Sequence, residues 1–341
     1  MKCLAKIDGK AKLVDIPEPQ IRPGTAKIRI DYCALCATDI HIVTQNLYRY
    51  PKDKFVGLGH EASGTIIEIG EGPESAGWKV GDRVAVASLG NCGYCDECKR
   101  NHDVFCQNKI FARPMMTEFA VLPFSMLFKI PDGEDAMKYC IAEPCASAMR
   151  GIDIADIKIG DSVCISGVGG IGAILLDMLT KQGVTKLTAI DPVASKRERA
   201  MEMGAKYVID PSSEDIVARG MEITQNRGYD VVIEASGVPV AAPPMMRMVA
   251  NKGKVVYFAV YPMDYELPVN LYEMYMKEVS LHTVYTTVYN YPRVMDLIPS
   301  LQTDKIIGPV MNLDQAEEAF ELYRQSIYPK IVVKCSGYKK E

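Results

Sequence analysis

Four regularly spaced cysteines are the residues of this chain most able to do chemistry. Two residues separate each of the first three, and seven separate the third from the last: Cys92, Cys95, Cys98 and Cys106. A two-residue gap lets two thiolates turn back onto one ion, so four thiolates at this spacing can surround zinc or hold an iron–sulfur cluster. Because the loop that carries them has little apolar core, metal binding would contribute directly to its folding.

A second group of metal-binding residue types lies in short motifs elsewhere. Cys36 begins the segment Cys-Ala-Thr-Asp-Ile-His, His60 is the centre of Gly-His-Glu, and Glu143 precedes a proline. A thiolate, an imidazole and a carboxylate are the ligand set of a catalytic zinc, which keeps one coordination position open. The chain has 4 histidines, and two of them, His41 and His60, fall in these motifs. The combination predicts a catalytic metal, although a lone histidine is more often an ordinary core or surface residue.

A glycine-rich motif predicts a dinucleotide site. The pattern G-x-G-x-x-G follows an expected strand at 162–166 and opens an expected helix at 170–181; its residues are Gly167, Val168, Gly169, Gly170, Ile171 and Gly172. In this context the glycines allow a tight turn, a close approach of the backbone to a pyrophosphate, and close packing of the helix on the sheet. The amino end of the helix supplies free N–H groups for the phosphates.

An acidic residue indicates which dinucleotide is bound. Asp191 follows nineteen residues after Gly172, at the end of the next expected strand. There it would accept hydrogen bonds from the adenosine ribose and repel a 2′-phosphate. Lys196 and Arg197 lie nearby and carry the opposite charge. The pattern therefore favours NAD and leaves NADP as the alternative.

Two patterns of apolar and polar residues along the chain predict the helices and strands that position these residues. Short alternating runs such as 26–32 and 83–87 indicate β strands in the first part. From about residue 161, short apolar strands alternate with helices, which indicates an α/β protein with a parallel sheet covered on both faces. The pair Pro243-Pro244 predicts an interrupted helix that restarts near Met245. The pattern alone leaves open where the segment after about residue 290 belongs.

Composition excludes several classes of function. The 341 residues are enough for two domains, and a net charge of −4 gives no reason to expect nucleic acid or an anionic membrane as a partner. We find neither a signal peptide nor an apolar run long enough for a membrane span, and we expect a cytoplasmic protein. In that compartment, 11 cysteines indicate thiols and metal ligands rather than disulfides.

Together these motifs resemble the zinc-dependent medium-chain dehydrogenase/reductase family. The segment Cys-Ala-Thr-Asp-Ile-His is similar to the family's C-x-[ST]-D-x-H, Gly-His-Glu to its G-H-E, and the four-cysteine loop to its structural zinc site. The resemblance implies a GroES-like β-barrel catalytic domain, formed by residues 1–150 and 290–341, that carries both zinc sites. Residues 151–289 would form the NAD-binding Rossmann domain, with a doubly wound parallel sheet.

The resemblance also assigns metal ligands. Cys36 and His60 would be the first two ligands of the catalytic zinc. The third would be Glu143 or Glu61, as in the polyol, threonine and butanediol dehydrogenases, with Cys145 as a weaker candidate. The four-cysteine loop would hold a second, structural zinc rather than an iron–sulfur cluster.

Other residues would orient ligands or line the cofactor. Asp39 would orient a ligand imidazole. Lys196, Ser236 and Val260 would line the dinucleotide.

The expected reaction is hydride transfer between NAD and a secondary alcohol or ketone, with zinc as a Lewis acid. Thr38 would take the proton of the alcohol, the nicotinamide ribose would pass it to His41 near the surface, and Glu61 could share that role. The Glu-Pro motif indicates a polyol, a diol or an amino alcohol as the substrate. Thr286 stands where sugar-polyol dehydrogenases carry an arginine, which argues against sorbitol. A loop with Tyr48, Arg49 and Tyr50 could also face the substrate.

Two alternatives remain. The first is a carbonyl reductase of the same family that prefers NADPH, and the second is a zinc- and dinucleotide-binding protein without turnover.

The family is usually dimeric or tetrameric, so we expect a homodimer or homotetramer that pairs through an edge strand at 279–284.

Overall fold

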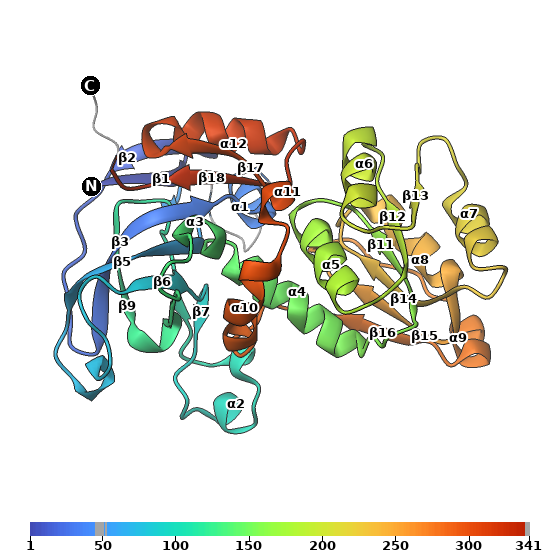
Figure 1. The fold of residues 1–341 in the computed structure, drawn as a ribbon, viewed down its shortest axis with the longest axis horizontal. Helices are drawn as coiled ribbons and strands as arrows, with labels where there is room; N and C mark the ends of the chain where they lie inside the picture. Colours follow the sequence, from blue (N-terminus) through green and yellow to red (C-terminus); the bar gives the residue numbers. More distant parts are fainter. Residues whose placement is uncertain (45–50, 52, 338–341) are drawn as a thin grey trace. The chain divides into compact units, whose positions relative to one another are not determined.

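The structure, a computed structural model, describes residues 1–44, 51 and 53–337, and the chain divides into two compact units (Figure 1). Met1–Ala146 and Thr287–Glu341 form the first unit, and Ser147–Thr286 form the second. Among the described residues, no helix is both long enough and apolar enough to cross a membrane.

The first unit is built on a seven-stranded mixed sheet. Its order is β10–β6–β5–β3–β18–β17, with β9 paired to the first half of β3. The strands are β3 (Thr25–Ala34), β5 (Glu61–Ile69), β6 (Arg83–Val86), β9 (Phe119–Pro123), β10 (Leu127–Lys129), β17 (Ile307–Asn312) and β18 (Lys330–Lys334). β18 pairs antiparallel with β3, so that Val332 lies opposite Ala34. The C-terminal segment therefore belongs to the sheet of the first unit.

Smaller elements complete the first unit. Two small sheets are formed by β1 (Lys2–Ile7), β2 (Lys10–Asp15) and β4 (Val56–Gly57), and by β7 (Leu89–Gly90) and β8 (Ile110–Phe111). Its helices are α1 (Ala37–Thr44), α2 (Asp96–Lys99), α3 (Ala136–Tyr139), α10 (Tyr291–Leu297), α11 (Thr303–Ile306) and α12 (Ala316–Arg324). Helix α4 (Ala142–Ala155) begins in the first unit and ends in the second.

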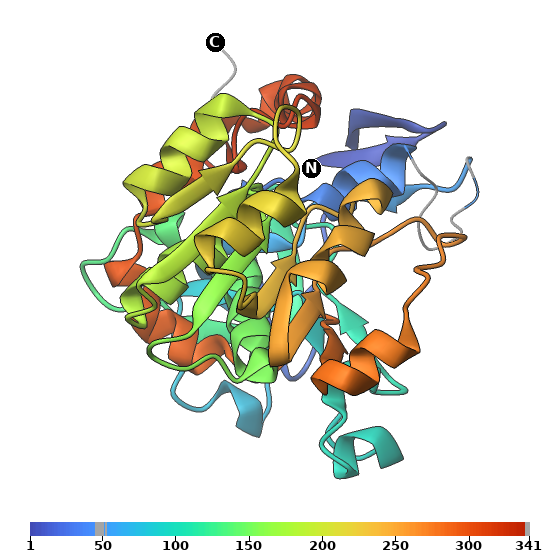
Figure 2. The same cartoon turned by 90° about the vertical axis from the view of Figure 1, so that its right-hand side faces the viewer.

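The second unit has a six-stranded parallel sheet in the order β13–β12–β11–β14–β15–β16. The strands are β11 (Ser162–Ser166), β12 (Lys186–Ile190), β13 (Tyr207–Ile209), β14 (Tyr229–Glu234), β15 (Val249–Tyr257) and β16 (Ser280–Thr283). Helices lie on both faces of the sheet: α5 (Gly170–Lys181), α6 (Ala194–Glu202), α7 (Ile216–Ile223), α8 (Ala242–Met248) and α9 (Leu271–Lys277) (Figures 1 and 2). Because both faces are covered, every residue of β11 is buried. The strand order reverses between β11 and β14, which is where such sheets bind ligands.

One predicted element was wrong. The two prolines do not delay the helix to Met245, because α8 begins at Ala242 and holds both of them in its first turn. The first N–H groups of a helix have no partner within it, so proline is tolerated at these positions.

Candidate metal centre and dinucleotide site

The four predicted cysteines of the loop around α2 converge. Their sulfur atoms all lie within 4.8 Å of one another, and three of the four side chains are buried. Desolvation tends to raise the pKa of the Cys92 thiol, but the backbone N–H of Tyr94 and the Asn108 amide lower it to about 6. Four thiols in this arrangement fit a tetrahedral ion with no open position, which is the geometry of a structural zinc.

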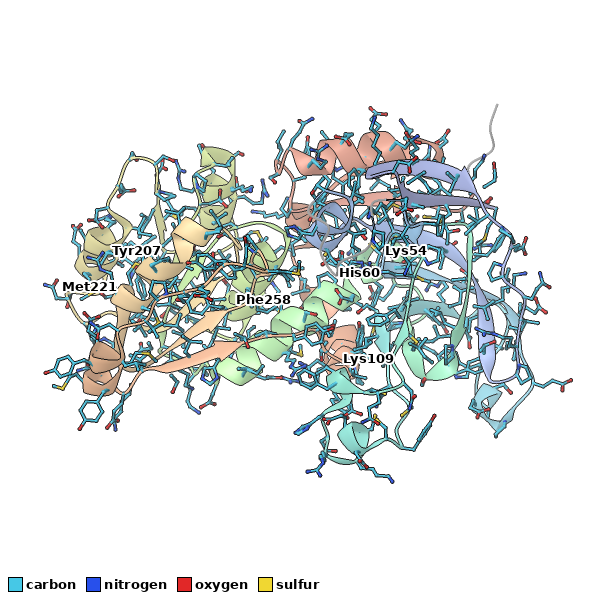
Figure 3. The ribbon with its side chains drawn as sticks, turned by 180° about the vertical axis from the view of Figure 1, so that it is seen from behind. Lys54, His60, Lys109, Tyr207, Met221 and Phe258 are labelled. Carbon is cyan, nitrogen blue, oxygen red and sulfur yellow. The ribbon has the colours of Figure 1, made fainter. Side chains whose placement is uncertain are left out.

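A second group of donors forms where β3 and β5 pair. Cys36 follows β3, His60 immediately precedes β5, and Glu61 is the first residue of β5. Glu61 lies opposite Ala34 in the antiparallel register, which brings the two segments together. The donor atoms of Cys36, His60 and Glu61 all lie within 4.8 Å of one another. His60 is buried in the first unit (Figure 3). The thiol, imidazole and carboxylate therefore fit one metal ion.

Asp39 organises the loops that carry two of these donors. One of its oxygens accepts a hydrogen bond from the Gly59 N–H at 3.0 Å, and the other accepts one from the Cys36 N–H at 3.1 Å. The first oxygen also lies 3.6 Å from Nδ1 of His60. Burial tends to raise the pKa of Asp39, but His60 lowers it to about 2. Asp39 is therefore ionised and able to fix the orientation of the imidazole.

The thiol of Cys36 lies in surroundings that favour its ionised form, the thiolate. Burial tends to raise its pKa, but Lys330 and His60 lower that pKa to about 6. The thiolate is the form of cysteine that acts as a metal ligand. The nearby cations therefore prepare this position for a metal ion.

Lys330 is a site residue that the sequence reasoning missed. It is the first residue of β18, and its Nζ lies 2.6 Å and 2.7 Å from the two carboxylate oxygens of Glu61. Both side chains are buried, at 2% and 0% relative exposure. Burial tends to lower the pKa of Lys330, but Glu61 raises it well above its ordinary range. Lys330 therefore supplies a positive charge to the carboxylate of the metal group.

Glu143, the other predicted carboxylate ligand, lies outside this donor group. It occupies the first turn of α4 and accepts a hydrogen bond from the Ser88 hydroxyl at 2.9 Å. Cys145 is fully buried and also lies outside the group. Among the described residues, Glu61 is thus the carboxylate that reaches donor distance of both Cys36 and His60.

The two predicted proton-transfer residues share one helix. Thr38 and His41 lie three residues apart on α1, a spacing that places two side chains on the same face. The Cys36 sulfur and the Thr38 hydroxyl lie 3.6 Å apart, so Thr38 borders the metal group. Tyr48, Arg49 and Tyr50 lie outside the described residues.

The glycine motif forms the predicted strand–turn–helix in the second unit. Gly167 has a φ of 91°, and a Cβ on it would lie 2.8 Å from atoms of Ser236. A Cβ on Gly172 would lie 1.9 Å from the Gly167 carbonyl oxygen, so only glycine lets α5 start this close to the turn. Gly169 caps α5, and a Cβ there would contact no protein atom, which leaves its backbone accessible to a phosphate.

Asp191 and the basic residues near it are held firmly. The two oxygens of Asp191 accept hydrogen bonds from the N–H groups of Val168 and Val193, both at 2.9 Å. The ammonium of Lys196 lies 3.8 Å from the Asp191 carboxylate. Arg197 donates to the Asp191 carbonyl at 2.7 Å and pairs with Asp210 at 2.9 Å. The carboxylate of Asp191 thus lies directly beside the glycine turn. The guanidinium of Arg197 is already bound to the Asp191 carbonyl and to Asp210.

Comparison with known proteins gives the family. The profile of the alcohol dehydrogenase GroES-like domain matches residues 22–132, and that of the zinc-binding dehydrogenases matches residues 170–300. The chain belongs to the zinc-dependent alcohol dehydrogenase family. L-threonine 3-dehydrogenase of Pyrococcus horikoshii is 32% identical over 332 residues, which cover 94% of each chain.

Solved structures share the fold of this dehydrogenase. A zinc-binding dehydrogenase from Clostridium scindens has a TM-score of 0.90 at 31% identity, covering 95% of this chain and 94% of that chain. One from Sinorhizobium meliloti, bound to NADP, has a TM-score of 0.89 at 26% identity and covers 98% of each chain. The predicted family and the predicted combination of GroES-like and Rossmann folds are confirmed. Zinc and a nicotinamide dinucleotide are the cofactors of this family.

Two further residues of the dehydrogenase lie in loops after the carboxyl ends of strands. Ser236 follows β14, and its hydroxyl donates to Glu234, which is fully buried. The hydroxyl of Tyr261 also donates to Glu234. Val260 follows β15 and is 47% exposed. Glu234, which the sequence reasoning missed, thus holds the loop that contacts Gly167.

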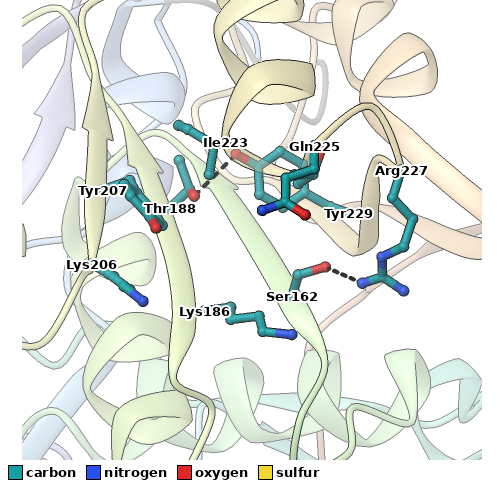
Figure 4. Close-up of a pocket in the computed structure, with 10 residues that line it drawn as sticks. Ser162, Lys186, Thr188, Lys206, Tyr207, Ile223, Gln225, Arg227 and Tyr229 are labelled. Carbon is teal, nitrogen blue, oxygen red and sulfur yellow. Dashed lines mark hydrogen bonds between the residues drawn. The ribbon is translucent and has the colours of Figure 1, made fainter.

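A separate cavity of about 450 Å³ lies at the opposite, amino ends of the strands (Figure 4). Its lining includes Ser162, Lys186, Tyr207 and Tyr229, the first residues of four adjacent strands. The Tyr229 hydroxyl donates to Thr188 at 3.0 Å inside it. Because the cavity contains neither the glycine turn nor a donor group for a metal, we assign the dehydrogenase chemistry elsewhere.

Proposed function

We propose that this protein oxidises a secondary alcohol to a ketone with NAD as the acceptor, or catalyses the reverse reaction. The alcohol loses a hydride from carbon and a proton from oxygen, giving ketone, NADH and one proton. The observation that carries the proposal is the convergence of Cys36, His60 and Glu61 within 4.8 Å of one another. We place a catalytic zinc there and a structural zinc on the four cysteines, two ions per chain.

Zinc, when bound, supplies a Lewis acid for the substrate oxygen, and the nicotinamide supplies a hydride acceptor. Cys36, His60 and a carboxylate hold the metal, and Asp39 orients the imidazole of His60. Thr38 accepts the proton of the alcohol, and His41 passes it on from the same face of α1. Lys330 keeps the Glu61 carboxylate in place beside the metal group.

NAD is the cofactor that we favour over NADP. The Asp191 carboxylate lies beside the glycine turn, where its charge would repel a 2′-phosphate. Arg197, the residue best suited to bind that phosphate, is engaged by Asp210 at 2.9 Å. The relative solved with NADP keeps the NADPH-preferring reductase as the alternative. The ratio of kcat/KM for the two cofactors decides between them.

The substrate class that we propose is a polyol, a diol or an amino alcohol. The Glu-Pro motif at Glu143 and the similarity to an L-threonine 3-dehydrogenase support this class. Thr38 and His41, which lie on the helix beside the metal donors, argue against a binding protein without turnover, because binding alone needs no proton transfer.

A homodimer or homotetramer is the assembly that we propose. β16 is an edge strand of the parallel sheet, and one of its sides has no partner strand among the described residues. Near it, α9 exposes Leu271, Tyr272 and Tyr275, each at 70% or more relative exposure. An unpaired edge next to exposed apolar residues can pair with a second copy of the chain.

The test is a panel of polyols, diols and hydroxy amino acids with zinc-loaded protein and NAD, read as NADH absorbance. We expect turnover of at least one secondary alcohol and none in the Cys36→Ser variant. Equal turnover by Cys36→Ser, or no turnover of any member by the wild type, would contradict the proposed function.

A further inference from the structure

An arginine borders the metal group in a way that nothing above explains. Nη2 of Arg113 lies 3.2 Å from Nδ1 of His60, the residue placed among the metal ligands. Arg113 is half-buried, so it reaches the metal group from a position that solvent can still enter.

The segment around Arg113 is fixed against the loop that carries His60. The Met115 N–H bonds to the carbonyls of Leu58 at 3.2 Å and Gly59 at 3.0 Å. A Cβ on Gly57 would lie 2.6 Å from Pro114, so the two segments are in direct contact. The Ala112 N–H bonds to the Ser88 carbonyl at 2.9 Å on the other side. The guanidinium therefore belongs to a firmly held part of the site, unlike a loose surface arginine.

Arg113 helps to lower the pKa of Asp39 through its charge, but it makes no close ion pair of the kind that other arginines of the chain make. Five arginines pair with a carboxylate within 2.9 Å: Arg29 with Asp31, Arg197 with Asp210, Arg219 with Glu222, Arg227 with Asp230 and Arg324 with Glu321. Across the described part of the chain, no carboxylate lies within ion-pair distance of Arg113. One of its N–H groups faces His60, and a guanidinium has five in a planar fork. Most of its donors are therefore available to a ligand.

We propose that Arg113 binds an anionic group of the substrate, and that the secondary alcohol oxidised here carries a carboxylate or a phosphate near its carbinol carbon. A planar guanidinium matches both groups through two parallel hydrogen bonds. A neutral polyol would leave most N–H donors of this guanidinium without an anionic ligand. The inference rests on the proposed dehydrogenase function and narrows its substrate class.

A purely orienting role for Arg113 is the competing explanation. Arg113 could serve only to hold His60, and its loss would then weaken metal binding and affect all substrates alike. Binding of a substrate anion would instead affect anionic substrates alone. The two roles separate when matched neutral and anionic substrates are compared at equal zinc content.

The experiment compares wild type, Arg113→Gln, Arg113→Lys and the control Arg219→Gln, which removes a surface arginine of the second unit. The substrates are 3-hydroxybutyrate and threonine as carboxylates, a polyol phosphate as the phosphate, and 1,3-butanediol and the free polyol as matched neutral alcohols.

We expect the wild type to prefer an anionic member of this set of substrates. Arg113→Gln should lower kcat/KM for that member by about 10- to 100-fold, mainly through KM. The neutral alcohols should change less than about twofold, and Arg113→Lys should recover part of the loss.

A binding measurement removes the dependence on turnover. Calorimetry of the zinc-loaded proteins with inorganic phosphate and with acetate should show weaker binding in Arg113→Gln than in Arg219→Gln, with unchanged zinc content and melting temperature. Whichever of the two anions binds more tightly identifies the group.

Two results would overturn the inference without touching the proposed function. One is a wild type that oxidises only neutral alcohols, and the other is an Arg113→Gln variant that loses activity equally on every substrate. A wild type inactive on the whole panel would instead remove the dehydrogenase function itself.

Discussion

The two metal groups of the first unit use the same kind of atom for different purposes. The four-cysteine group offers only thiols, spaced along one short loop. The group at Cys36 draws donors from the ends of β3 and β5 and adds an imidazole and a carboxylate. The first arrangement can close a tetrahedral shell, and the second leaves room for a substrate. What surrounds the ion therefore separates a structural site from a reactive one.

The neighbours of the two groups differ as well. Asp39, Lys330 and Arg113 bring three charges to the Cys36 group. The four-cysteine group is bordered mainly by backbone N–H groups and amides, such as those of Cys92 and Asn108 that contact the Cys106 sulfur at 3.3 Å. Charged neighbours tune ligands for chemistry, whereas backbone donors stabilise a fixed cluster. The predictions below separate these roles.

The largest effect is expected from Cys36→Ser. Loss of the thiolate should lower kcat by about a thousandfold or more, because the Lewis acid contributes several kcal/mol to the reaction. The melting temperature should stay near that of the wild type, since the surrounding sheet does not depend on this ion. Turnover and a thermal melt of the same preparation measure both. A large fall in melting temperature would show that this group is also structural.

Cys95→Ser should give the reverse pattern. Without its structural ion the loop has little core of its own, so the melting temperature should fall by roughly 5 to 10 °C. The protein that remains folded should keep most of its turnover at low temperature. A melting temperature equal to that of the wild type would contradict the division of roles between the two groups.

Lys330→Met should destabilise the chain by about 3 to 5 kcal/mol, because it leaves the Glu61 carboxylate buried without its cation. The double variant Lys330→Met/Glu61→Gln removes both charges and should recover part of that loss. Chemical denaturation of the three proteins without metal gives the comparison. If the double variant is no more stable than Lys330→Met, the pair does not act as a unit.

Glu61→Gln and Glu143→Gln test which carboxylate is the third ligand. Glu61 lies within donor distance of Cys36 and His60, whereas Glu143 bonds to Ser88. Zinc affinity should therefore fall more in Glu61→Gln than in Glu143→Gln, by about 100-fold or more relative to the wild type. Competition with a chelator measures both affinities. The opposite order would make Glu143 the ligand, which requires the side chain to leave Ser88.

Asp39→Asn should have the smallest effect of the set. It keeps the shape of the side chain and removes the charge that orients His60, so zinc affinity should fall by about 10- to 100-fold. The four-cysteine group should keep its ion. Equal loss of zinc from both groups would indicate general unfolding instead.

The sequence revealed sites made from neighbouring residues better than sites made by pairing distant strands. The four-cysteine loop and the glycine turn contain their chemistry within a few residues, and their spacing alone indicated a function. Lys330 reaches Glu61 across 269 residues, because β18 pairs with β3. No local pattern could show that contact, although a lysine opening an apolar strand is an unusual residue to bury.

The choice between Glu61 and Glu143 also exceeded what the sequence could show. Both carboxylates stand in recognisable motifs, and only distances of a few ångströms separate a ligand from a neighbour. The predicted start of the helix near Met245 was wrong for a different reason. Proline does interrupt the interior of a helix, but the pattern could not show that α8 begins at Ala242 and holds both prolines in its first turn.

The most direct test of the central claim is a zinc count and a turnover number on the same sample of wild type and of Cys36→Ser. We predict two zinc ions per chain and NAD-dependent turnover for the wild type, and one zinc ion without turnover for the variant. A Cys36→Ser protein that keeps both ions, or that turns over like the wild type, would show that Cys36, His60 and Glu61 do not form the catalytic centre.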